Sequence, residues 1–198
     1  MAAYVEFISR RPGVPLEAFH AIAGPGQVHW GERYGEDRLI LNVGRTWRIG
    51  PEPEYLCIWN TPGRSLDRLQ GWADVFATGE ADDLEKAFEA AGRIDAAGMY
   101  DVLREPVPAT GPLHYVEFFD TDDPTAALAA YEARAAGNAL VLNALLDRIG
   151  PLGPDPRGIA VWQAPSFAVI ESCAREVPGA GVRIVRAGLY APIGAEVL

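Results

Sequence analysis

Two glutamates stand in matching, strand-like surroundings in the two halves of the chain. Glu6 and Glu117 each occupy the third position of a Tyr-Val-Glu-Phe run. Because successive side chains of a strand point to opposite faces, each glutamate shares a face with the tyrosine before it, Tyr4 or Tyr115. A carboxylate held away from water has a raised pKa and suits general acid or base catalysis. The chain therefore offers Glu6 and Glu117 as candidate catalytic groups, with Tyr4 and Tyr115 as substrate contacts. The structural alternative is that each glutamate only pairs with an arginine, such as Arg45 or Arg148.

The chain has three histidines, His20, His29 and His114, and their spacing fits no short metal-binding motif. We therefore expect no metal site. His29 follows Gly24-Pro25-Gly26, which we expect to end the first helix, and it lies in a polar connection that the second half lacks. Since histidine is the usual proton shuttle near neutral pH, His29 is the candidate acid or shuttle. His20 and His114 are assigned structural roles, with His114 expected to point toward the helices.

Matched aromatic and amide residues are candidate substrate-binding groups. Trp59 and Trp162 end equivalent apolar runs and could form flat walls for a planar ligand. Asn42 and Asn143 could bind a substrate carbonyl. The structural alternative for each aromatic residue is ordinary core packing.

These candidates recur because the halves of the chain resemble each other. The matched blocks are residues 4–7 with 115–118, 39–42 with 140–143, 48–51 with 148–151, 57–59 with 160–162, and 97–100 with 187–190. A period this long indicates a duplicated domain, since solenoid repeats span about 20 to 50 residues. We predict a first module over residues 1–105, a linker over 106–112 and a second module over 113–198.

Each half predicts the order β-α-β-β-α-β, which is the ferredoxin-like arrangement. The first half predicts strands over 4–9, 39–47, 55–60 and 99–103, with helices over 16–22, 66–76 and 81–91. The second predicts strands over 113–119, 140–149, 158–163 and 182–190, with helices over 125–136 and 167–176. Residues 140–149 favour a helix locally, but the repeat favours a strand. The fold class is α+β: two tandem ferredoxin-like modules that form an intramolecular pseudo-dimeric α/β barrel. We expect the wholly apolar face of each sheet under the helices, and Glu6 and Glu117 between the two sheets.

Bulk properties exclude several function classes. The formal net charge is −10 and lysine occurs only once, which argues against binding nucleic acid or an anionic membrane. The two cysteines occupy non-equivalent repeat positions, so we expect free thiols and a cytoplasmic protein. No Rossmann glycine motif or Walker A motif occurs. The expected partner is a small molecule, and the expected state is a monomer or homodimer.

The run of residues 39–42, the Ile-Gly-Pro turn at residues 49–51 and the strand ending at Trp59 resemble the dimeric α/β-barrel superfamily, in particular its NIPSNAP-like and EthD-like branches. The second half matches through Ile149-Gly150-Pro151. In NIPSNAP-like sequences a helix with basic residues follows, and Arg64 and Arg68 are in that place here. The resemblance implies two sheets around a central cavity. It also implies a choice among cofactor-free monooxygenases, polyketide cyclases, lactone isomerases and haem proteins, so fold alone does not decide the reaction.

We therefore expect a cofactor-independent enzyme that acts on a small aromatic or polyketide-like intermediate. Glu6 or Glu117 would be the base in a cyclisation, isomerisation or dehydration, and His29 the acid. The alternatives are a cofactor-independent aromatic monooxygenase, a non-catalytic ligand carrier, and a haem-binding barrel with His20, His29 or His114 as axial ligand.

Overall fold

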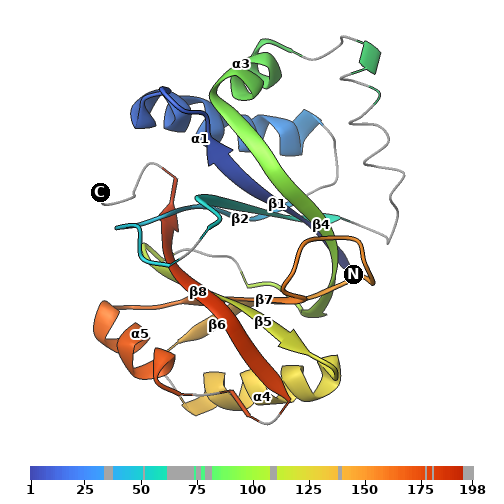
Figure 1. Cartoon of the computed structure of the whole chain (residues 1–198), viewed down its shortest axis with the longest axis vertical. Helices are drawn as coiled ribbons and strands as arrows, with labels where there is room; N and C mark the ends of the chain where they lie inside the picture. Colours follow the sequence, from blue (N-terminus) through green and yellow to red (C-terminus); the bar gives the residue numbers. More distant parts are fainter. Residues whose placement is uncertain are drawn as a thin grey trace.

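The first half of the chain forms a four-stranded sheet with helices on one side (Figure 1). The computed structural model describes residues 1–33, 38–50, 52–61, 74, 77–78, 82–107, 111–137, 140–176, 178–179 and 181–193, and of residues 27, 28, 30–33, 38 and 61 it describes the backbone only. The first-half elements are β1 (Ala2–Arg10), α1 (Leu16–Arg33), β2 (Arg38–Arg45), β3 (Tyr55–Thr61), α3 (Asp83–Ala91) and β4 (Gly92–Arg104). Nearly all of the helix expected over 66–76 lies outside the described residues.

The second half repeats this order. Its elements are β5 (His114–Thr121), α4 (Pro124–Gly137), β6 (Val141–Arg148), β7 (Gly158–Gln163), α5 (Phe167–Ala174) and β8 (Val182–Pro192). The strand expected over 140–149 is confirmed by β6, so sheet pairing overrides the local helix preference of this segment. The two halves have the same element order, but their origin by duplication stays a prediction.

The strands close into one antiparallel barrel in the order β1-β3-β2-β8-β5-β7-β6-β4. Each half contributes a continuous ferredoxin-like sheet, and the seams between halves are β2 with β8 and β4 with β6. In Figure 1, α1 and α3 lie above the strands and α4 and α5 lie below them. The α+β barrel expected from the sequence is thus confirmed, with the helices outside it.

In each half, the loop that follows the second strand forms backbone hydrogen bonds with a strand at one of the two seams. At one seam Leu189 N donates to Ile49 O at 3.1 Å, and at the other Met99 N donates to Leu152 O at 2.7 Å. Gly50 approaches β8 so closely that a Cβ there would lie 2.4 Å from Ala187 O, so this position requires glycine. The two loops therefore occupy equivalent places, with Ile49 matching Leu152. The alignment of residues 48–51 with 148–151 is three positions out of register and is wrong.

The barrel interior is filled by the apolar face that we expected under the helices. Val5, Phe7, Val116 and Phe118 belong to one buried cluster that draws on both halves. Tyr4 and its neighbours on the opposite face instead pack against α1 and α3. The expected orientation of the sheets is therefore wrong. In a closed barrel both faces of each strand are buried, so an apolar face is not by itself a sign of helix cover.

The first helix is longer than expected. α1 runs through Pro25, although we expected Gly24-Pro25-Gly26 to break it, so His29 lies within a helix and not in a connection. Proline removes one backbone donor, but here the helix continues on both sides of it. α3 begins with a capping box in which Asp82 accepts from Leu84 N and Glu85 N. No helix among the described residues is long and apolar enough to cross a membrane.

Candidate functional site

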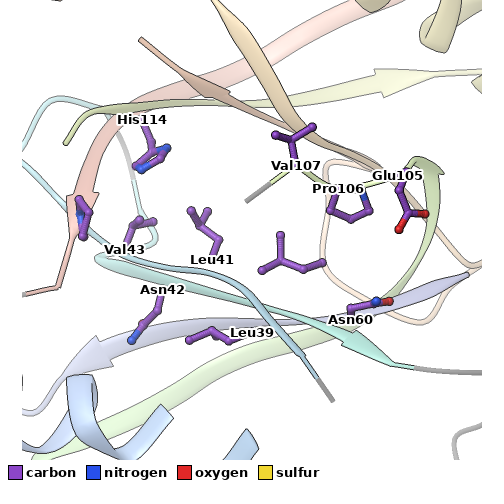
Figure 2. A pocket seen from close by; sticks show the side chains of 11 residues that line it. Leu39, Leu41, Asn42, Val43, Asn60, Glu105, Pro106, Val107 and His114 are labelled. Carbon is purple, nitrogen blue, oxygen red and sulfur yellow. The ribbon is translucent and has the colours of Figure 1, made fainter. Parts of the chain in front are cut away.

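A pocket of about 430 Å³ lies beside β2, near its seam with β8. Its walls come from β2, the first residue of β5 and the segment that follows β4 (Figure 2). Its apolar lining includes Leu39, Leu41, Val43, Pro106 and Val107. The volume is within the range of small-molecule sites, about 300–1,000 Å³. This pocket is therefore a candidate place for a ligand.

His114 projects into this pocket from β5 (Figure 2). It is fully buried, and neither ring nitrogen has a side-chain hydrogen-bond partner among the described residues, although the backbone of Gly111 lies close enough to interact with the ring. Burial lowers the pKa of His114, although the backbone of Gly111 opposes the shift. Burial thus favours the neutral imidazole, in which one nitrogen carries a proton and the other has a lone pair that can bind a metal or accept a proton. His114 does share a face with Val116, as expected, but that face is the barrel side, so its expected direction toward the helices is wrong.

The other polar groups of the pocket are few. Asn60 Oδ1 is buried without a partner in the part of the chain that the structure describes. The amide of Asn42 donates to Ala23 O of α1 at 3.5 Å, and Figure 2 shows its side chain directed away from His114. Glu105 is the one charged residue among the described lining residues. The pocket therefore carries no described cation that would neutralise an anionic ligand.

The second module buries its glutamate in an ion pair beneath α4. Arg134 Nη1 donates to both carboxylate oxygens of Glu117 at 2.8 Å, and Trp162 Nε1 donates to one of them at 3.0 Å. Arg134 also donates to the backbone oxygen of Cys173. Its burial lowers the pKa of Arg134, but the Glu117 carboxylate outweighs this and the net pKa is raised. Glu117 therefore has an arginine partner, as the structural alternative above expects, and that partner is Arg134 and not Arg45 or Arg148.

The first module keeps the tryptophan but has no described cation beside its glutamate. Trp59 Nε1 donates to Glu6 Oε2 at 3.1 Å. Burial raises the pKa of Glu6 to about 7, against the hydrogen bonds from Trp59 and Cys57. Glu6 and Glu117 both lie between sheet and helices, so the expectation that they face each other across the barrel is wrong. Neither borders the pocket, and their catalytic role stays a prediction.

The remaining predicted residues are not brought together. Tyr4, Trp59, Tyr115 and Trp162 face the helices with the glutamates. Their substrate-binding role stays a prediction, and none of them lines the described pockets.

The asparagines and the other histidines are also scattered. The side-chain amide of Asn143 donates to Val107 O. Asn143 is the bulged residue of β6, and the bulged residue of β2 is Ile40, so Asn143 is not the counterpart of Asn42. His29 Nε2 lies 2.5 Å from Asp82 Oδ2, which ties α1 to the start of α3. His20 Nε2 lies 3.2 Å from the Tyr55 hydroxyl.

Arg134 is the functional neighbour that sequence reasoning missed. It is a single arginine in an alanine-rich helix, and with Ala127 and Tyr131 it forms the buried stripe of α4. That spacing, i, i+4 and i+7, was the available signal. Within the described residues, no group of three or more His, Cys, Asp or Glu side chains could hold a metal ion.

No protein-family model and no curated protein matches the chain. Solved structures do match over nearly its whole length. A mutant chlorite dismutase from Candidatus Nitrospira defluvii in complex with cyanide has a TM-score of 0.58 at 10% identity, covering 97% of this chain and 91% of the other. A haem-binding protein from Thermus thermophilus has a TM-score of 0.55 at 13% identity, covering 98% and 92%.

A dye-decolorizing peroxidase from Bacteroides thetaiotaomicron gives a TM-score of 0.56 at 7% identity, covering 97% of this chain and 92% of the other. Likeness at such low identity establishes the fold alone. None of these three proteins is NIPSNAP-like or EthD-like, so that closer relationship stays a prediction. The chain has the ferredoxin-like α+β barrel fold of chlorite dismutases and dye-decolorizing peroxidases.

Proposed function

We propose that this protein binds haem in the pocket beside β2, with His114 as the axial ligand. The observation that carries the proposal is the buried imidazole of His114, which lines a pocket and has no side-chain hydrogen-bond partner among the described residues. A buried polar group without a partner costs about 1–3 kcal/mol, so a ligand that satisfies it is favoured. The haem-binding protein from Thermus thermophilus among the similar structures supports the same choice of ligand.

The lining residues fit haem in two respects. His114 is neutral, as a metal ligand must be, and burial keeps it so. Leu41, Val43 and Val107 offer apolar walls to a macrocycle. Because the described lining has no arginine or lysine, the carboxylates of the haem would have to reach solvent. Bound haem would supply an iron centre whose reactivity depends on its axial ligand and on the polarity of the pocket.

Titration with haem tests this proposal directly. We expect a Soret band that saturates at one haem per chain, and we expect His114→Ala to lose it. His20→Ala is the matched control, since His20 is already engaged with Tyr55 and should keep the band. A variant His114→Ala that binds haem like the parent chain would exclude this site. Hydrogen peroxide with an aromatic dye then separates a peroxidase from a carrier, which binds haem without turnover.

The acid–base enzyme that the sequence favoured, whether cyclase, isomerase or dehydratase, is the weaker candidate. The observation that favours this enzyme is the raised pKa of Glu6, about 7, which suits proton transfer near neutral pH. Against it, Glu6 lies beneath the helices of the first module and borders neither described pocket. The monooxygenase alternative has no observation of its own in favour.

A further inference from the structure

A second pocket, of about 400 Å³, lies at the β2–β8 seam beyond the wall of the first. Its lining includes Leu113, Pro165 and Ala191, and no described lining residue is charged. Leu113 and Ala191 stand next in sequence to His114 and Pro192, which line the first pocket. The start of β5 and the end of β8 therefore separate two pockets, and the second is the more apolar in character.

Two exposed aromatic side chains stand together at this second pocket. Trp47, in the loop after β2, and Phe167, the first residue of α5, have ring centroids 4.5 Å apart with planes tilted by 39°. Each is 42% exposed, while the described tryptophans Trp59 and Trp162 are buried. The pair joins the two modules across the seam and leaves its outer surface open to a ligand.

The backbone that carries Trp47 is strained. Trp47 has φ 50° and Arg48 has φ 54°, both in the left-handed region. For a bulky side chain this conformation is an outlier that costs about 1–3 kcal/mol, and such residues cluster at ligand clamps and active sites.

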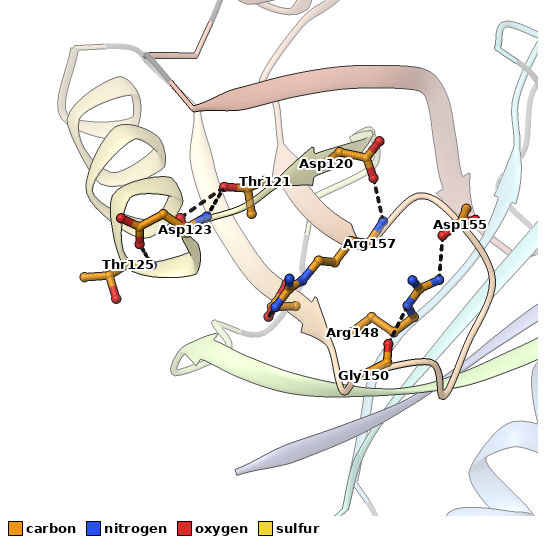
Figure 3. A network of polar contacts seen from close by, with 9 residues as sticks. Asp120, Thr121, Asp123, Thr125, Arg148, Gly150, Asp155 and Arg157 are labelled. Carbon is orange, nitrogen blue, oxygen red and sulfur yellow. Dashed lines mark hydrogen bonds and ion pairs between the residues drawn. The ribbon is translucent and has the colours of Figure 1, made fainter.

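The corresponding loop of the second module has only one left-handed position among its described residues. This loop is held by Arg148, which donates to Gly150 O and Asp155 (Figure 3) and to Gly153 O at 2.9 Å. The last contact matches Arg45 to Gly50 O at 3.0 Å in the first module. In this register Trp47 corresponds to Gly150, which has φ 54°. Arg48 corresponds to Pro151, whose φ is fixed at a negative value, so the two turns differ; the left-handed position that they share carries glycine in the second module and tryptophan in the first.

We propose that this second pocket binds an uncharged, planar aromatic small molecule against the Trp47–Phe167 pair. Aromatic faces and the apolar floor offer contact area, while no described lining residue would pair with a charge. The strained turn keeps the indole of Trp47 at the rim of the pocket. This site does not depend on haem binding at His114, so the two proposals can be tested separately.

Titration calorimetry with 2-naphthol as the probe tests the site, and naphthalene-2-sulfonate is the charged control. We expect 2-naphthol to bind at least tenfold more tightly than the sulfonate. We expect Trp47→Gly and Phe167→Ala each to weaken 2-naphthol binding at least tenfold, and His114→Ala to leave it unchanged. Trp47→Gly should also melt at the same temperature as the parent chain or higher, because it removes the strain.

Three results would overturn the proposal. The first is equal binding of 2-naphthol and the sulfonate. The second is unchanged binding in both Trp47→Gly and Phe167→Ala. The third is a Trp47→Gly variant that melts several degrees lower, which would make Trp47 a packing residue of the seam. Loss of haem binding in His114→Ala, with 2-naphthol binding retained, would separate the two sites.

Discussion

Each module buries a glutamate and a tryptophan beneath its helices, but only the second module adds a described cation. Trp162 and Arg134 both donate to Glu117, whereas Glu6 accepts from Trp59 and lies beside Cys57. The strand motif around the two glutamates is the same. The difference therefore comes from the helices that cover the two sheets.

The two covering helices share a buried stripe with the spacing i, i+4 and i+7. The stripe is Phe19, Ala23 and Gly26 in α1, and Ala127, Tyr131 and Arg134 in α4. Gly26 thus stands where α4 has Arg134. A carboxylate in a fixed strand position can be an ion-pair partner or a proton-binding group, and the described parts of the two covering helices differ at this position.

Removing the cation of the second module should have the largest effect. Arg134→Leu leaves Glu117 buried without its partner, and breaking a buried pair in this way costs about 3–5 kcal/mol. The measurement is the free energy of unfolding in urea. Arg175→Leu is the control, because its ion pair with Glu171 is exposed and should matter little. An Arg134→Leu variant within about 1 kcal/mol of the parent would show that the two modules do not differ energetically.

Neutralising the glutamate of the first module should stabilise the protein, whereas Arg134→Leu should destabilise it. The pKa of Glu6 rises from 4.5 to about 7 on folding, so the folded chain holds a proton that the unfolded chain has released. The free energy of unfolding should therefore fall as the pH rises from about 4.5 to 7 and then level off. Glu6→Gln removes this slope and should stabilise the protein by up to about 3 kcal/mol at pH 8, but not near pH 4.5.

The same substitution at Glu117 tests whether the paired glutamate of the second module behaves differently from Glu6. Glu117→Gln takes the charge from the partner of Arg134, so it should destabilise at pH 8. If both glutamine variants shift stability in the same direction at pH 8, Glu6 is not an uncompensated carboxylate.

The sequence predicts the fold well because the fold depends on the order of elements. Alternating strands and helical stretches, read twice, are enough to identify two ferredoxin-like sheets. The matches of residues 57–59 with 160–162 and of 97–100 with 187–190 agree with the strand registers. Glu6 pairs with Cys57 and Ala97, and Glu117 pairs with Ala160 and Ala187.

The site was harder to predict because it depends on which face of a strand a residue occupies. Aligning Asn42 with Asn143 was two residues out of register, and bulges in β2 and β6 shift the alternation nearby. The direction of Glu6 and His114 required knowing that the barrel closes, which no local pattern reports. The partner of Glu117 comes from α4, and strand alternation carries no information on helix contacts.

Replacing the two buried tryptophans should give a smaller difference in stability between the modules. Trp59→Phe and Trp162→Phe remove the same indole donor from buried glutamates. At pH 8 Trp59→Phe should cost about 1 kcal/mol more, because Arg134 still donates to Glu117 while Glu6 loses its indole bond. Near pH 5 Glu6 holds its proton, and a bond to a neutral group is worth less, so the excess cost should shrink. Both variants lose similar ring volume, so the difference between them isolates the hydrogen bond from the packing. Equal costs at both pH values would mean that the charge of Glu6 has no influence on the stability of the first module.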